Sequence, residues 1–165
     1  MYRKLDKPAS LSRPGMSQSS QPETTARREW ISALAKAPPG RLAALLPDLP
    51  AHEMLRAPEI GTVMVQGRIG GTGVPFNLGE MTVTRCSVRL SEGAVGHACV
   101  QGRDKAHAAR AAVADALMQT GAAPQIATQV LAPLRAAAAR ARATRAAKAA
   151  ATRVEFFTML RGEDA

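Results

Sequence analysis

Aromatic residues are scarce in this sequence, where only 3% of 165 residues are Phe, Trp or Tyr. Hydrophobic residues make up 46%, but much of that share is alanine, which buries little area. At about 25 cal/mol for each Å² of apolar surface removed from water, a core rich in alanine gives a weak driving force for folding. We therefore expect a thin core that gains stability from a partner subunit.

Cysteine and long apolar runs are also lacking. Cys86 and Cys99 are too few for a disulfide scaffold, and neither lies in a CxxC or CxxH metal spacing. No stretch approaches the roughly 18 consecutive apolar residues of a membrane helix. The basic N-terminus lacks the apolar segment of a secretory signal, and the three histidines form no metal-binding pattern. These absences indicate a cytoplasmic protein without a metal site.

Acidic residues are missing where the positive charge is densest. The net charge is +9, and residues 135–153 carry Lys and Arg but no Asp or Glu. Such an excess attracts nucleic acid, anionic membranes or phosphorylated molecules, although a solvated helix face explains it more simply. The Ala/Arg-rich segment resembles basic alanine repeats of linker histones, so nucleic-acid binding is the alternative function. No interleaved aromatic, helix-turn-helix or zinc pattern supports it, which makes nucleic acid an unfavoured partner.

The pattern along the chain predicts an α+β protein. Residues 1–22 are rich in Ser, Pro and Gln and are expected to be a disordered basic tail, whereas residues 23–165 form one domain. We expect helices over 24–37, 41–46, 104–120 and from about 126 to 152, the last being long and Ala/Arg-rich. Period-two alternation over 62–101 predicts three antiparallel strands, and residues 154–165 could add a fourth or dock onto a neighbour.

The turn after residue 90 sets the register of the second hairpin. A two-residue loop would place Cys86 opposite Cys99, whereas a three-residue loop over 91–93 pairs Cys86 with Ala98 and Ser87 with His97. We favour the longer loop because it puts Val88 on the apolar face and His97 on the polar one. In that register the two cysteines lie on opposite faces and cannot form a disulfide.

The segment "GRIGGTGVPFN" raises the question of a phosphate cradle. A P-loop needs Lys and then Ser or Thr directly after its last glycine, and here Val74 and Pro75 follow instead. No βαβ unit surrounds the glycines, so a dinucleotide site is also excluded. We favour a tight structural or interface loop over an anion cradle of backbone N–H groups for Gly70, Gly71, Thr72 and Gly73.

Two polar groups are further candidates for anion or subunit contact. The first is a face shared by Arg68, Arg85 and Arg89, whose guanidinium groups suit phosphate or carboxylate, although a solvated sheet face explains them equally well. The second is the expected strand-to-helix turn, in which Asp104 caps the following helix and is not expected to act as an acid or base. The residues of that turn are Gln101, Gly102, Arg103, Asp104, Lys105 and His107, with His107 expected on the polar surface. The buried stripe of the following helix is expected to hold Ala106, Ala109, Val113, Ala116 and Leu117.

Several long strings resemble the PhnG family, the G subunit of the bacterial carbon–phosphorus lyase system. They are "RAPEIGTVMVQGRIGGTGVPFNLGEMTVTRCSVRL", "GHACVQGRDKAHAARAAVADALMQ" and the ending "TRVEFFTMLRGEDA". The resemblance implies a non-autonomous subunit of a transferase complex that displaces adenine from ATP with a phosphonate, giving α-D-ribose 1-methylphosphonate 5-triphosphate. It implies PhnI, PhnH and PhnJ as partners, with PhnL acting alongside, and ATP as a substrate of the complex.

The resemblance assigns no catalytic residue and no bound cofactor to this chain. Its role is therefore expected to be structural, in assembly of the complex. The family motif positions would shape loops and subunit contacts, and with their neighbours they are Gly70, Gly71, Thr72, Gly73, Arg85, Arg89, Gln101, Gly102, Arg103, Asp104, Lys105, His107, Phe156 and Phe157.

Overall fold

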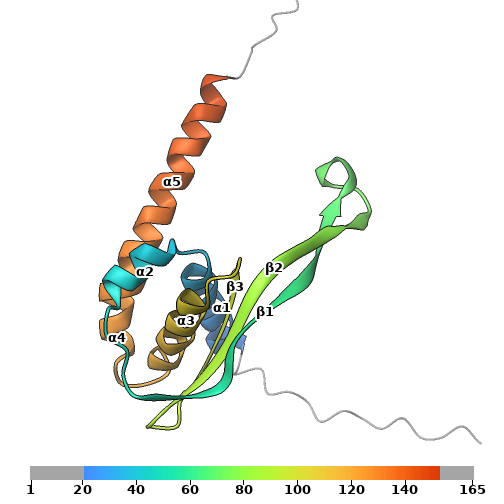
Figure 1. The fold of residues 1–165 in the computed structure, drawn as a ribbon. Helices are drawn as coiled ribbons and strands as arrows, with labels where there is room; N and C mark the ends of the chain where they lie inside the picture. The colour runs from blue at the N-terminus through green and yellow to red at the C-terminus, as the bar shows by residue number, and fades with distance from the viewer. Residues whose placement is uncertain (1–20, 153–165) are drawn as a thin grey trace, which may run out of the picture.

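The computed structural model describes residues 21–152 (Figure 1). The residues before and after that range include most of the expected tail, Phe156, Phe157 and the proposed last strand, so those expectations stay predictions. The elements are α1 (Gln21–Ala35), α2 (Pro39–Leu45), β1 (His52–Arg68), the 3-10 turn η2 (Ile69–Gly71), β2 (Pro75–Leu90), β3 (Val95–Gln101), α3 (Lys105–Leu117), α4 (Ala123–Ile126), the π-helical turn η3 (Ala127–Leu131) and α5 (Ala132–Ala151). The predicted α+β class is confirmed.

One antiparallel sheet has the strand order β1-β2-β3, as predicted. The favoured register of the second hairpin is confirmed, because Cys86 pairs with Ala98 and Ser87 with His97. The Ser87 hydroxyl and His97 Nδ1 lie 2.9 Å apart on the exposed face. Cys86 is buried and Cys99 is exposed, so the two thiols are on opposite faces.

The first hairpin is longer than the alternation indicated. β1 begins at His52, ten residues before the expected start, and β2 begins at Pro75. The pairing skips residues of β1 between Met54 and Arg56 and again between Arg56 and Glu59. Each extra residue inverts the side-chain alternation, so the first half of β1 shows no period of two. This is why the sequence pattern located only its second half.

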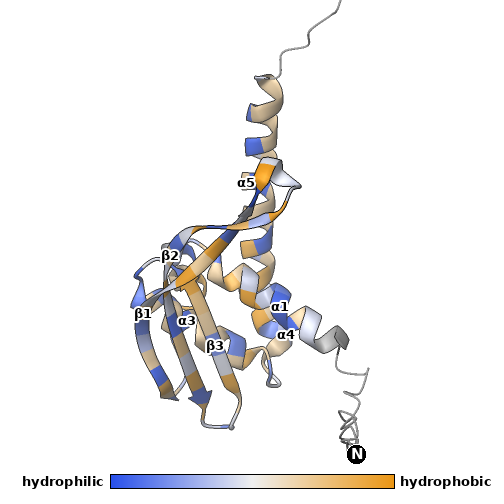
Figure 2. Ribbon diagram, turned by 90° about the vertical axis from the view of Figure 1, so that its right-hand side faces the viewer, coloured by the Kyte–Doolittle hydropathy of each residue, from blue (hydrophilic) through white to orange (hydrophobic). Residues whose placement is uncertain are grey.

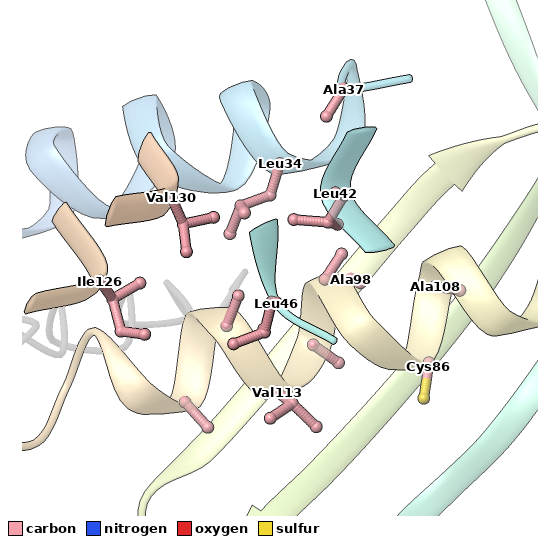
Figure 3. Packing of buried hydrophobic residues seen from close by; sticks show 14 of the residues in the cluster. Leu34, Ala37, Leu42, Leu46, Cys86, Ala98, Ala108, Val113, Ile126 and Val130 are labelled. Atoms are coloured by element: carbon pink, nitrogen blue, oxygen red, sulfur yellow. The ribbon is translucent and has the colours of Figure 1, made fainter. Parts of the chain in front are cut away.

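Helix α3 packs against one face of the sheet and is covered on its other side by α1 and α2, against which η3 packs in turn (Figures 1 and 3). The predicted stripe is confirmed at Val113 and Ala116, which are buried, and Ala109 and Leu117 are partly buried against the core, but Ala106 is exposed. The helix also buries residues outside that stripe, namely His107, Ala108, Ala111, Ala112, Ala114 and Asp115. A helix that is covered on two sides buries more than one stripe. Large side chains of the core come from its neighbours, namely Leu34, Leu42, Leu46, Val88, Leu90, Val100, Ile126, Val130, Leu131 and Leu134.

The last helical segment leaves the body of the protein. The π-helical turn η3 ends two residues before Pro133, which has no N–H to give to an earlier carbonyl. A wider turn at that point accommodates the proline ring without breaking the helix. From residue 138 to 151 every residue of α5 is exposed, and Figure 1 shows the helix projecting away from the sheet. Its cations stand in solvent. No helix in the described part of the chain is long and apolar enough to cross a membrane.

The two thiols should differ in reactivity. Burial raises the pKa of the Cys86 thiol, which therefore holds less of the reactive thiolate at a given pH. With Ellman's reagent we expect fast native-state reaction of Cys99 and reaction of Cys86 only after denaturation. The Cys99→Ser variant should lose the fast phase and Cys86→Ser should keep it; a fast phase that persists in Cys99→Ser would contradict the assignment.

Candidate functional site

The most distinctive surface is the outer part of the first hairpin, residues 60–81, which we call the hairpin arm. It extends beyond the region that α3 covers (Figure 1). Within the range 21–152, the large hydrophobic side chains that are exposed all lie on β1, β2 or the turn between them. They are Met54, Leu55, Ile60, Met64, Ile69, Val74, Phe76 and Leu78, and Figure 2 shows hydrophobic residues continuing towards the tip of the arm.

The "GGTG" segment forms the tip of this arm. Gly70 and Gly71 have φ angles of 60° and 85°, a conformation that favours glycine. The Gly73 N–H donates to the Ile69 carbonyl at 2.8 Å, and a Cβ at Gly73 would lie 2.6 Å from that oxygen. The glycines thus serve the reversal of the chain at the tip.

An aromatic ring packs across the two strands next to the tip. Phe76 lies opposite Gly67, and its ring would be 3.2 Å from a Cβ at that glycine. Arg68 Nη1 donates to the Gly73 carbonyl at 3.2 Å, which ties β1 to the turn. Packing of a ring over a strand glycine and a side-chain bond across the turn both hold the arm in one shape.

The predicted arginine face does not form one cluster. Arg68 pairs at the tip, opposite Pro75, whereas Arg89 lies at the other end of β2, about 45 Å away at 3.3 Å per residue. Arg85 Nη2 donates to the Thr62 carbonyl at 3.1 Å. Arg89 forms an exposed ion pair with Glu53 at 3.6 Å. Each guanidinium group therefore has its own local partner, and the three could not hold one anion together.

The strand-to-helix turn is built as predicted at its cap. Asp104 Oδ1 accepts from the His107 N–H at 2.8 Å, and Gly102 has a φ of 92°. Gln101, Arg103 and Lys105 are exposed. The expectation that His107 belongs to the polar surface is wrong, because its ring is buried and its Nε2 lies 3.0 Å from the Leu34 carbonyl. This contact joins α3 to the end of α1.

A shallow hollow of about 440 Å³ lies beside this turn and is open to solvent. Lys105 lines it together with residues 56–60 of β1, where Arg56 and Glu59 form an exposed pair at 3.8 Å. The hollow has charged groups but no nucleophile next to a base among its lining residues. It supplies no arrangement for covalent or acid–base chemistry.

A buried polar network escaped the sequence prediction. Asp115 of α3 is fully buried and accepts from Arg27 Nη2 at 2.8 Å and Trp30 Nε1 at 2.8 Å, both on α1. It also accepts from the His97 N–H of β3 at 2.9 Å. One carboxylate thus connects two helices to the last strand. An Asp in the middle of an alanine-rich helix was the one available signal, because such a residue is rarely buried without partners.

Helix α5 carries five cations, with no acid anywhere in its twenty residues. At 3.6 residues per turn, Arg135 and Arg142 lie on one side and Arg140 lies far from them around the helix. The cations are therefore distributed around the helix and do not form one groove-facing row. Nucleic-acid binding stays an alternative prediction.

Comparison with known proteins gives two findings. The model of the family described as phosphonate metabolism protein PhnG matches residues 25–162. A protein of Rhizobium meliloti (strain 1021), named alpha-D-ribose 1-methylphosphonate 5-triphosphate synthase subunit PhnG, is 50% identical over 145 residues, which are 84% of this chain and 90% of that protein. The chain therefore belongs to the PhnG family of phosphonate metabolism proteins.

Proposed function

We propose that this chain is a non-catalytic subunit of an α-D-ribose 1-methylphosphonate 5-triphosphate synthase, and that the hairpin arm is its main docking surface. The name of the 50% identical relative supports the first part. The apolar side chains exposed on the arm support the second, and this observation carries the proposal.

The arm has the composition of an interface core. Over residues 60–81 only Arg68 and Glu80 are charged, in a chain whose net charge is +9. Phe76 and Leu78 are 42% and 66% exposed, on an arm that lies beyond the covering helices. Depletion of charge with enrichment of aromatic and Met residues distinguishes the buried centre of interfaces from other surfaces. Burial of these side chains against a partner would supply the free energy that the thin alanine-rich core does not.

The chemistry belongs to the partners in this proposal. The resemblance assigns displacement of adenine from ATP to a complex containing PhnI, PhnH and PhnJ, with PhnL alongside. ATP would then be a substrate of the complex and not a cofactor of this chain. The motif glycines of the tip and the residues of the strand-to-helix turn would act by shaping surfaces that contact those subunits.

Removal of the two apolar groups near the tip should weaken assembly. We expect the Phe76→Ser/Leu78→Ser double variant to bind the other subunits at least about tenfold more weakly, because truncating a central interface side chain commonly costs about 1–3 kcal/mol. The isolated variant should keep most of its free energy of unfolding, since Leu78 is 66% exposed and the Phe76 ring packs over Gly67 of the arm and not in the core cluster. The measurement is co-expression with the other subunits, affinity purification through this chain, and sizing of the product.

Leu55→Ser is the matched control, because Leu55 is 41% exposed on the neighbouring strand β1 but outside the arm. It should assemble like wild type. Equal recovery of partner subunits with the double variant would remove the arm from the proposal. A wild-type chain that never recovers other subunits would overturn the proposed function itself.

A further inference from the structure

The edges of the sheet are protected unequally. On the outer edge of β3, the His97 N–H is bonded to the Asp115 carboxylate. The Val95 carbonyl on that edge accepts from Arg27 Nη2 at 3.1 Å and from Gln119 Nε2 at 2.8 Å. Side chains of α1 and α3 thus occupy backbone groups that another strand would need.

The first half of β1 is protected by other means. It contains Pro58, the charged residues Glu53, Arg56 and Glu59, and the two places where extra residues interrupt the pairing. Proline, charge and bulges are the devices by which natural edge strands avoid pairing with other chains. The outer half of β2 has similar features, with Pro75, Glu80 and an unpaired residue between Asn77 and Gly79.

The second half of β1 lacks proline, charge and extra residues, and within residues 21–152 its backbone accepts one side-chain bond, from the exposed Arg85 Nη2 to the Thr62 carbonyl at 3.1 Å. Residues 60–67 read "IGTVMVQG", without charge, proline or an extra residue in β1 itself. Their pairing partners belong to β2, on one side only, and in the described part of the chain no strand lies on the other side. Alternate N–H and C=O groups of an edge strand point outward, which makes this segment a template for a further strand.

We propose that residues 60–67 of β1 accept an extended segment of a partner subunit as a fourth strand. The proposal rests on the proposed docking role of the arm and adds how the partner binds there. Backbone bonds would supply affinity, and alternate side chains of the partner would meet the two faces of the arm. Ile60 and Met64 are exposed on one face, and Val63 and Val65 are half-buried on the other, so the partner segment should be apolar on both faces.

The net positive charge of this chain favours a different protein, and not a second copy of this chain, as the source of the added strand. Two copies that each carry +9 repel one another, whereas an acidic subunit is attracted. The segment itself, which meets an uncharged stretch of β1, should be free of charge where it pairs.

Hydrogen exchange tests the strand directly. In the isolated chain, the outward-pointing amides of residues 60–67 should exchange fast and the inward-pointing amides slowly. In the complex assembled by co-expression, the outward amides should slow at least about tenfold. Mass-spectrometric exchange of peptides covering residues 60–67, in the free chain and in the complex, measures this.

The outcomes separate this proposal from the proposed function. Suppose that the outward amides of residues 60–67 exchange equally fast in the free chain and in the complex, while Phe76→Ser/Leu78→Ser still weakens assembly. That result would overturn strand addition and leave the docking role in place. Protection already present in the isolated chain, with the mass of a dimer, would show that a second copy occupies the edge and would also overturn it. Failure of the double variant to weaken assembly would count against the docking role.

A charged substitution provides a second test. Met64→Lys places a charge in the uncharged segment and should reduce both the exchange protection and the recovery of partner subunits at least about tenfold. Leu55→Lys is the control, at an exposed position in the protected half of the same strand. Full protection of residues 60–67 in a Met64→Lys complex would contradict pairing at this edge.

Discussion

Replacing Gly96 with valine is expected to lower the free energy of unfolding by about 3 kcal/mol, at the upper end of the range for overpacking. A Cβ at Gly96 would collide with the Ala112 carbonyl oxygen and would lie 2.6 Å from the Ala116 nitrogen. Both are backbone atoms of α3, which cannot rotate away as a side chain can. The helix would have to move off the sheet and open gaps beside its buried alanines. Urea unfolding followed by circular dichroism measures the change.

Gly121→Ala is the matched control for this experiment. A Cβ at Gly121 would meet nothing within 4 Å, and its φ is not positive. This substitution should leave the unfolding midpoint unchanged or raise it slightly, because alanine restricts the unfolded chain more than glycine does. Wild-type stability of Gly96→Val would show that α3 does not rest on the sheet at Gly96.

The parts of the fold that the sequence could predict are those set by residues close to one another along the chain. Alternation and a local turn signal were enough for the register of β2 and β3, because residues 91–93 lie between the strands they connect. The cap at Asp104 was predictable for the same reason, since it bonds a residue three positions away. Such features depend on neighbours along the chain.

Features that depend on distant residues were not predictable in this way. The alanines of α3 look alike in sequence, so nothing distinguished the side facing Gly96 from the side facing α1. His107 was misplaced because its partner is the carbonyl of Leu34, 73 residues earlier. The exposed hairpin arm was also missed: its apolar residues read as ordinary strand residues, and only the structure shows that no helix covers them.

The "GGTG" motif stands between these cases. Its glycines and the absence of a following Lys indicated a turn, and the structure places them at the tip of a hairpin. What the pattern could not indicate is the position of that tip, far from the core and surrounded by exposed Ile69, Val74 and Phe76. The motif gains a candidate role in assembly from this position, and not from the glycines alone.

Loss of the Asp115 carboxylate should have the second large effect. We expect Asp115→Ala to lower the free energy of unfolding by about 3 kcal/mol, because removing one partner leaves the other groups of a buried pair without their bonds. The expected loss is at the lower end of the range for breaking a buried ion pair, because the Arg27 side chain is 34% exposed and keeps some contact with water. The N–H groups of His97 and Trp30 would each lose an acceptor as well.

Trp30 makes this prediction measurable in the folded state. It is the sole tryptophan of the chain, and its Nε1 donates to Asp115 Oδ1 at 2.8 Å. Asp115→Ala should therefore shift the native fluorescence spectrum as well as the urea midpoint, whereas Asp48→Ala, at an exposed position, should change neither. Asp115→Asn keeps the shape of the side chain but presents N–H donors where His97 or Arg27 also donates. Its free energy of unfolding should therefore lie between those of wild type and Asp115→Ala. If Asp115→Asn proved as stable as wild type, the network would act through shape and not through charge, and the link from α1 to the edge of β3 would not depend on the ion pair.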